Sequence, residues 1–333
     1  MRKTVRVALS GYATMDFTGR ADAPIVLDGT TPVTIGGGEW PRPGGAPLYA
    51  GKILAEAGQD VSILTAVGGD CAGAMFLAHL GQAGLSPATV SVRPGARTPT
   101  CILIHQDDGR YCCFFDRGDD AGGEMLSPIQ RKSLAEADWV VVSAGPEALS
   151  AQLLDLLLPH QKLAWIFKSD ALSFPPRLCR SLAKRASVLF CNQHERTALE
   201  SADCRFATDS IIFETQGGEG VRVHHHDGAT AVSTQERFDV DATGAGDTFA
   251  GGALSVLFEA GATPVDAAKA GLEAAAALLR GRLAMESEAR AEQIDGGFAQ
   301  AALSSRAPQA HASKSFTDCT RVSHSSGSAA TPA

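Results

Sequence analysis

Long hydrophobic runs are missing from this sequence of 333 residues. No apolar stretch approaches the about 18 residues that suggest a membrane-spanning helix. Basic residues are also few, since 29 Lys and Arg stand against 37 Asp and Glu and the formal net charge is −8. This balance argues against nucleic acid or an anionic membrane as a partner. Residues 1–16 start basic but turn polar at once, so they predict a first strand rather than a signal peptide, and we expect a cytoplasmic protein.

Several motifs that would define other classes of protein are also missing. The eight cysteines form no C-x-x-C pair, which argues against a structural zinc site and favours reduced thiols packed as small hydrophobic groups. No G-x-x-x-x-G-K-[ST] motif is present, so a P-loop enzyme is excluded. Residues 9–20 contain only Gly11 and Gly19, which is too few for the dinucleotide-binding fingerprint.

What the chain does contain is an alternation of short apolar runs and helix-like segments. Hydrophobic residues make up 44% and charged residues 20%, as in ordinary globular proteins. The alternation predicts an α/β fold with a central, mainly parallel sheet covered by helices on both faces. The expected strands are residues 5–10, 61–68, 139–145, 163–169 and 187–192, and the expected helices are residues 46–57, 71–83, 149–159 and 175–186.

Two stretches interrupt this alternation and read as hairpins. They are residues 25–35 and residues 100–115, the second with Asp108-Gly109 at its turn. We expect them to form a small β-sheet lid, over about residues 17–40 and 97–117. A further hairpin is expected at residues 221–232, turning at Asp227-Gly228. Residues 1–304 are expected to form one domain and residues 305–333, rich in Ser, Ala, Thr and Pro, a disordered low-complexity tail.

The most informative segment is FDVDATGAGDTFAGGAL, residues 238–254. A strand ending near Val240 is followed by a glycine-rich turn and an apolar helix, an arrangement that points backbone N–H groups at an anion. Asp247 lies beside that site, where a carboxylate would repel a bound phosphate. It is better suited to deprotonate a hydroxyl as a phosphoryl group arrives. The alternative is a helix cap with a glycine turn.

This segment closely resembles the C-terminal signature of the ribokinase-like (PfkB-type) sugar and nucleoside kinases, whose core reads D-T-x-G-A-G-D-x-F. The resemblance implies a ribokinase-like fold and transfer of the γ-phosphoryl group of ATP to a hydroxyl of a small sugar or sugar derivative. It implies that Asp247 is the catalytic base. It also implies that the amides of Gly244, Ala245 and Gly246 stabilise the transferring phosphate.

The N-terminal half resembles the same family, most closely its fructokinase-like members. Residues 43–73 resemble the N-terminal signature, in which Gly44 and Gly45 would lie against the substrate. Asp16 matches the acidic residue that binds substrate hydroxyls, although a turn cap is an alternative. Tyr49 stands where the fructokinase-like pattern has Asn, which argues against unmodified fructose or ribose. Arg117 falls in a stretch similar to R-G-A-D and would contact substrate, unless it forms only a surface salt bridge.

Two further motifs resemble the nucleotide site of the family. In CNQHE, Asn192 and Glu195 would organise Mg²⁺, with Glu195 acting through water. In TQGGEG, Thr215, Gly217 and Gly220 would contact the nucleotide. The implied cofactors are ATP and Mg²⁺, and family lids suggest a homodimer. A nucleoside kinase and a non-catalytic sugar- or nucleotide-binding protein remain alternatives. Lys168 ends a strand where fructokinase-like chains often have an acidic residue. Its ammonium group could contact an anionic group of the substrate, or it could simply be solvated.

Overall fold

The computed structural model describes residues 4–35, 40–106, 110–119, 126–234 and 236–304. The predicted tail of residues 305–333 and the Asp108-Gly109 turn lie outside these residues. The chain divides into two compact units, Met1–Arg290 and Ala291–Ala333, and every site discussed below lies in the first. No helix in the described part of the chain combines the length and the apolar composition of a membrane span.

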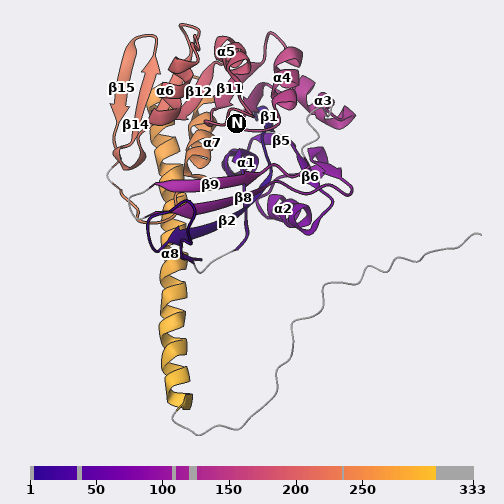
Figure 1. Ribbon diagram of the computed structural model, residues 1–333. Helices are drawn as coiled ribbons and strands as arrows, with labels where there is room; N and C mark the ends of the chain where they lie inside the picture. Colours follow the sequence, from indigo (N-terminus) through magenta and orange to yellow (C-terminus); the bar gives the residue numbers. More distant parts are fainter. Residues whose placement is uncertain (1–3, 36–39, 107–109, 120–125, 235, 305–333) are drawn as a thin grey trace, which may run out of the picture. The chain divides into compact units, whose positions relative to one another are not determined.

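An eight-stranded sheet is the centre of the first unit (Figure 1), in the order β15-β14-β13-β12-β11-β10-β1-β5. The six strands from β13 to β5 run parallel, and β14 and β15 are antiparallel at one edge. This confirms the predicted, mainly parallel sheet. The strands are β1 (Arg6–Ser10), β5 (Asp60–Leu64), β10 (Trp139–Val142), β11 (Lys162–Ile166), β12 (Val188–Asn192), β13 (Ile211–Thr215), β14 (Val221–His225) and β15 (Gly228–Val232).

Helices cover both faces of this sheet because successive strand residues point to opposite sides. Val7 and Leu9 of β1 belong to one buried cluster, together with residues of α1, α2, α7 and the start of α8. Ala8 belongs to the other cluster, with residues of α3, α4, α5 and α6. The helices are α1 (Ala46–Glu56), α2 (Cys71–Gln82), α3 (Pro128–Glu136), α4 (Glu147–Leu156), α5 (Pro176–Arg185), α6 (Gln193–Ser201), α7 (Ala245–Leu257) and α8 (Pro264–Ser304).

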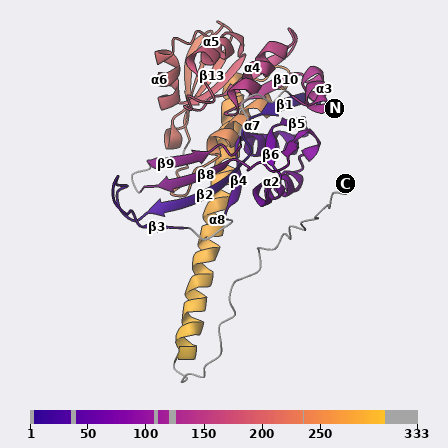
Figure 2. The same ribbon diagram turned by 45° about the vertical axis from the view of Figure 1, so that its right-hand side comes forward.

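A second, smaller sheet forms the lid, which Figure 2 shows beside α2 and below the main sheet. Its order is β3-β2-β8-β9. In addition, β4 pairs antiparallel with Thr14–Asp16, the first residues of β2. Asp16 of β2 lies directly opposite Arg42 of β4 and Cys101 of β8, and Cys101 lies opposite Phe115 of β9. These four side chains therefore form a row across the lid. The strands are β2 (Thr14–Ala21), β3 (Val33–Thr34), β4 (Arg42–Gly44), β8 (Thr100–His105) and β9 (Tyr111–Asp116).

The structure corrects the predicted strand at residues 61–68. Its first part is β5, but Ala66–Gly68 form β6, which leaves the main sheet and pairs in parallel with β7 (Ser91–Arg93). The break lies at Thr65, whose hydroxyl donates to the Gly11 carbonyl at 2.6 Å. A buried polar side chain thus interrupts a run that is apolar in the sequence.

Three other local predictions were also wrong in detail. Residues 25–35 form no hairpin, because only Val33–Thr34 is a strand and its partner is β2. Residues 237–240 form no strand before α7, since β15 is the edge of the main sheet. The hairpin of β14 and β15 turns at residues 226–227, because His225 already pairs with Gly228.

Candidate active site

The start of α7 carries the residues of the strongest sequence motif. Gly244 caps the helix with φ = 81°, a left-handed conformation that favours glycine. A Cβ on Gly244 would also lie 2.5 Å from the ring of Tyr49, which comes from α1. The Ala245 amide donates to the Ala242 carbonyl at 3.0 Å, a turn bond that it would have to exchange in order to bind a phosphate oxygen. The next two amides, of Gly246 and Asp247, have no hydrogen-bond acceptor among the described residues.

Asp247 lies in the first turn of α7 and is 6% exposed. Its Oδ1 atom is 3.1 Å from Nζ of Lys168, two residues after β11. A buried carboxylate thus lies at the same helix end as two free amides and beside one ammonium group. This combination can accept a proton and offset negative charge within one small region.

Asp16 lies at the lid end of the site, and its surroundings favour its neutral form. Burial raises its pKa above the ordinary value, although a hydrogen bond from Thr14, the charge of Arg42 and a hydrogen bond from Cys101 act in the opposite direction. The Thr14 hydroxyl donates to Oδ1 of Asp16 at 2.7 Å. An oxygen bound by an incoming hydroxyl donor would stabilise the ionised form. Asp16 is thus chemically suited to a ligand that brings hydroxyl groups.

Gly44 and Gly45 shape the wall behind Asp16. A Cβ on Gly44 would lie 2.1 Å from Oδ2 of Asp16, and a Cβ on Gly45 would lie 2.1 Å from the Tyr12 carbonyl oxygen. Gly45 also has φ = 89°. Both positions therefore require glycine for the fold itself, whether or not their backbone also contacts a substrate.

Asp241 is the centre of an ion-pair cluster whose role the sequence did not indicate. Its carboxylate is paired with Arg42 of β4 and lies 3.2 Å from Nε2 of His105 in β8. The hydroxyl of Thr243 also donates to it, at 2.6 Å. Burial opposes ionisation, but His105, Arg42 and Thr243 together hold the pKa of Asp241 well below its ordinary value. The lid is thereby joined to the segment that leads into α7.

Arg282 of α8 completes this cluster. Its Nη1 donates to the Asp241 carbonyl at 2.6 Å, and its Nη2 donates to the hydroxyl of Tyr49 at 3.2 Å. Burial raises the pKa of Tyr49, while the charges of Arg282 and Arg42 lower it less strongly. Asp241 is the first residue of the C-terminal signature, so the sequence indicated its position. Arg42, His105 and Arg282 lie outside every motif, and nothing in the sequence indicated that they belong to the site.

Asn192 and Glu195 are brought together at the start of α6. The Asn192 side chain accepts from the Glu195 amide, and the Glu195 side chain accepts from the Asn192 amide, both at 2.8 Å. This is a capping box, so both side chains also cap the start of α6. Burial raises the pKa of Glu195, although Lys168 and the Asn192 amide lower it. A buried carboxylate of this kind, next to Asp247, has the donor chemistry that hydrated Mg²⁺ prefers.

Thr215, Gly217 and Gly220 form the turn between β13 and β14. Gly217, with φ = 58°, begins a short 3₁₀ turn (Gly217–Glu219), and a Cβ there would meet open space. A Cβ on Gly220, with φ = 108°, would lie 2.2 Å from the Val232 carbonyl oxygen. Thr215 lies opposite Asn192 in the neighbouring strand, and its hydroxyl donates to the Cys191 carbonyl at 3.4 Å. Gly220 is thus needed for packing, while Gly217 leaves one face accessible.

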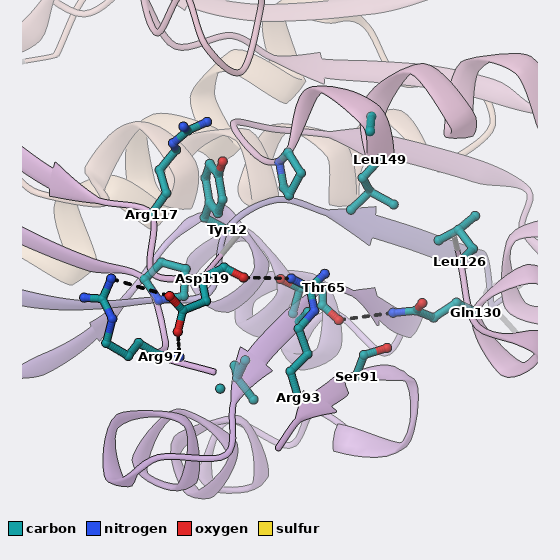
Figure 3. Close-up of a pocket in the computed structure, with 16 residues that line it drawn as sticks. Tyr12, Thr65, Ser91, Arg93, Arg97, Arg117, Asp119, Leu126, Gln130 and Leu149 are labelled. Atoms are coloured by element: carbon teal, nitrogen blue, oxygen red, sulfur yellow. Dashed lines mark hydrogen bonds and ion pairs between the residues drawn. The ribbon is translucent and has the colours of Figure 1, made fainter. Parts of the chain in front are cut away.

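Arg117 directly follows lid strand β9. Figure 3 shows it with Tyr12 on the wall of a pocket that also contains the ion-paired Arg97 and Asp119. Neither Asp16 nor Asp247 is among the residues that line this pocket. The structure thus brings the predicted residues together in three groups, at the lid, at the start of α7 with α6, and at the β13–β14 turn. Arg117 lines a pocket together with Tyr12, which packs against Phe115 of the lid.

Comparisons with known proteins show the family of this chain. A family model described as pfkB family carbohydrate kinase matches residues 6–290. A comparison of the sequence with curated proteins finds no match.

Solved structures share the fold at low sequence identity. Ribokinase from Cryptococcus neoformans var. grubii serotype A, in complex with ADP, has a TM-score of 0.69 at 21% identity and covers 82% of this chain and 93% of its own. A nucleoside kinase from Methanocaldococcus jannaschii has a TM-score of 0.66 at 15% identity, covering 83% and 92%. A nucleoside kinase from Burkholderia thailandensis, in complex with inosine, has a TM-score of 0.63 at 18% identity, covering 81% and 90%.

Proposed function

Because the chain belongs to the pfkB family of carbohydrate kinases, we propose that it transfers the γ-phosphoryl group of ATP to a hydroxyl group of a small sugar or sugar derivative. The observation that carries this proposal is the buried Asp247 carboxylate beside the free amides at the start of α7. Simple anion binding gives no reason for a carboxylate at that place, whereas proton abstraction requires one.

In the proposed reaction, Asp16 accepts hydrogen bonds from hydroxyl groups of the acceptor. Asp247 takes the proton of the reacting hydroxyl as its oxygen forms a bond to the γ-phosphorus. The bond from that phosphorus to the β-phosphate oxygen breaks, and ADP leaves. Amides of the Gly244–Gly246 segment and of Asp247 offset the charge on the phosphoryl group. The lid, held by the pairing of Arg42 with Asp241, excludes water as a competing acceptor.

The nucleotide is proposed to lie between the β13–β14 turn and α7. Gly217, whose Cβ position faces open space, lets the backbone approach the nucleotide, with Thr215 beside it. Glu195, with Asn192, would hold Mg²⁺ through water. Mg²⁺ held there would neutralise part of the negative charge on the phosphate groups.

A nucleoside kinase is the second candidate. It is favoured by an aromatic pair at the acceptor end of the site, because the ring centroids of Tyr12 and Phe115 are 4.9 Å apart in an edge-to-face arrangement. Phe115 belongs to the same cross-strand row as Asp16. A planar base could pack against such a pair. Tyr49 already contacts Gly244 and Arg282, so it is less available for this role.

A homodimer through the lid is a further proposal, supported by apolar side chains on the lid. Ile102 and Phe114 lie opposite each other on β8 and β9 and are 46% and 57% exposed. Paired exposed residues of this size are typical of an interaction surface. Light scattering tests the dimer, and a monomeric mass at micromolar concentration contradicts it.

The experiment that tests the function measures ATP consumption with Mg²⁺ against a panel of sugars, sugar acids and nucleosides. Turnover should depend on one class of acceptor, and Asp247→Asn should lower kcat by about 10³-fold or more while ATP affinity is retained. Asp266→Asn is the matched control, since Asp266 lies in the first turn of another helix, α8. Turnover that survives Asp247→Asn contradicts the mechanism. ATP binding without turnover favours the non-catalytic binding protein.

A further inference from the structure

Lys168 is the one cation that directly contacts Asp247 among the described residues. It lies in the loop after β11, where the Asp170 amide donates to the Lys168 carbonyl at 2.8 Å. This bond fixes the backbone from which the side chain extends. The ammonium group reaches Oδ1 of Asp247 at 3.1 Å, and the ammonium also lies in the field of the Glu195 carboxylate.

The Lys168 ammonium also lies over the start of α7. A Cβ on Gly246 would be 3.9 Å from Nζ, and apart from the adjacent residues and the backbone of α7 no other described atom lies within 4 Å of that position. The amides of Gly246 and Asp247, which have no acceptor among the described residues, belong to the same helix turn. A full positive charge and two free donors thus converge on the space beside Asp247.

The charge state of Lys168 follows from its neighbours. Burial favours the neutral amine, but Asp247 and Glu195 raise the pKa of Lys168 well above its ordinary value. Lys168 is therefore an ammonium group at physiological pH. Its side chain is 39% exposed, compared with 9% for Asp247.

A permanent ion pair would be a poor arrangement for a base, because a bound cation makes a carboxylate less basic. The conflict disappears if the ammonium has a second partner during turnover. A phosphoryl group at the start of α7 offers several negatively charged oxygens, and an ammonium group with three donors can bind one of them without leaving the site.

We propose that Lys168 is a catalytic residue that binds an oxygen of the γ-phosphoryl group of ATP and neutralises its charge during transfer. Lys168 then holds Asp247 in place before ATP binds, and contact with the phosphoryl group frees Asp247 to accept the proton. The inference rests on the proposed kinase function. It adds a positive charge supplied by this chain to the charge supplied by Mg²⁺.

Nucleotide binding tests the contact without any acceptor. Lys168→Met should weaken binding of a non-hydrolysable ATP analogue with Mg²⁺ by about tenfold to a hundredfold, the range expected for one charged hydrogen bond. Binding of ADP with Mg²⁺, which lacks the γ-phosphoryl group, should stay within about twofold. Isothermal titration of the full-length protein measures both. Lys168→Arg, which keeps the charge, should restore at least part of the preference for the analogue.

Lys162→Met is the matched control, because Lys162 lies at the opposite end of β11 and packs over Trp139. It should leave both affinities unchanged. A melting curve checks that Lys168→Met is folded. If it is not folded, the titrations compare Lys168→Arg with the wild type instead. Equal weakening of both nucleotides, or of neither, overturns the proposal for Lys168 and leaves the kinase function standing. A wild-type protein that binds neither nucleotide overturns both.

Discussion

The ring of Tyr49 fills the space that a side chain on Gly244 would need, since a Cβ there would lie 2.5 Å from the ring. Tyr49 belongs to α1 and Gly244 caps α7, so this contact fixes the start of α7 against a neighbouring helix. The Tyr49 hydroxyl is held in turn by Arg282. Replacement of the family's Asn by Tyr therefore changes the wall behind the proposed phosphoryl site as well as the acceptor site.

Gly244→Ala should lower both stability and turnover. A methyl group meets the Tyr49 ring, and the residue must keep φ = 81°. Gly58→Ala is the matched control, because Gly58 has φ = 79° and open space around its Cβ position. The control isolates the backbone strain, about 1 kcal/mol, and the collision should add about 1–3 kcal/mol. Urea unfolding measures both, and equal losses would show that the ring contact is unimportant.

Asp16→Asn should stabilise the fold while it removes acceptor binding. Burial raises the pKa of Asp16 above its unfolded value, although Thr14, Arg42 and Cys101 oppose the shift. The folded state therefore binds the proton more tightly, and ionisation costs stability as pH rises through the folded pKa. The side chain of Asn does not ionise and avoids this cost. The Tm of Asp16→Asn should therefore exceed that of the wild type by more at pH 8 than at pH 4. A gain that is larger at pH 4 contradicts the prediction.

Asp241→Asn should have the opposite effect on stability. Its pKa is lowered because, against burial, His105, Arg42 and Thr243 stabilise the carboxylate. That stability is present above the unfolded pKa of about 3.9 and is lost as pH falls through the folded value. At pH 7 the variant leaves the largely buried Arg42, whose side chain is 17% exposed, without its partner and should lose about 3 kcal/mol.

The control for Asp241 is Asp116→Asn, which breaks an ion pair with Arg97 in which both side chains are more than half exposed. Its loss should stay below about 1 kcal/mol. Urea unfolding at pH 7 and pH 3 compares the two variants, and the gap between Asp241→Asn and wild type should narrow at the lower pH. A gap that does not change with pH would remove the electrostatic explanation.

Local sequence signals predicted much of the fold because they depend on neighbouring residues. The order of strands and helices followed from their periodicity. The helix expected at residues 71–83 is α2, which Asp70 caps: its side chain accepts from the Gly73 amide at 2.8 Å and from the Thr98 amide. The prediction of one strand over residues 61–68 was wrong, because β5 ends at Leu64 and the next residue, Thr65, uses its buried hydroxyl to donate to the Gly11 carbonyl.

The ion-pair cluster could not be predicted in the same way. Arg42 and Asp241 are 199 residues apart, and Arg282 reaches the Asp241 carbonyl across 41 residues. Arg42 and Arg282 look like ordinary surface residues in the sequence, and only the folded chain brings them to one carboxylate and one carbonyl. The motif identified where Asp247 lies, but the cation beside it came from the structure.

Cys113 of the lid should be a site of inhibitory alkylation. Its side chain is exposed, and a hydrogen bond from Cys101 lowers its pKa against the effect of burial, so more of the reactive thiolate is present near neutral pH. Cys101 lies directly opposite Asp16 on the neighbouring strand, so an adduct on Cys113 would lie next to the proposed acceptor site. N-ethylmaleimide should therefore inhibit turnover.

Cys113→Ser should protect against this inhibition, whereas Cys71→Ser should not, because Cys71 is exposed at the start of α2, outside the lid sheet. A saturating concentration of acceptor should also slow alkylation of Cys113, since a bound ligand would cover the face of the lid that carries Asp16 and Cys101. Mass spectrometry locates the adduct, and kinase assays follow the loss of activity. Modification of Cys113 with full retention of turnover would show that the thiol lies outside the acceptor site, because an adduct next to Asp16 must obstruct any ligand that binds there.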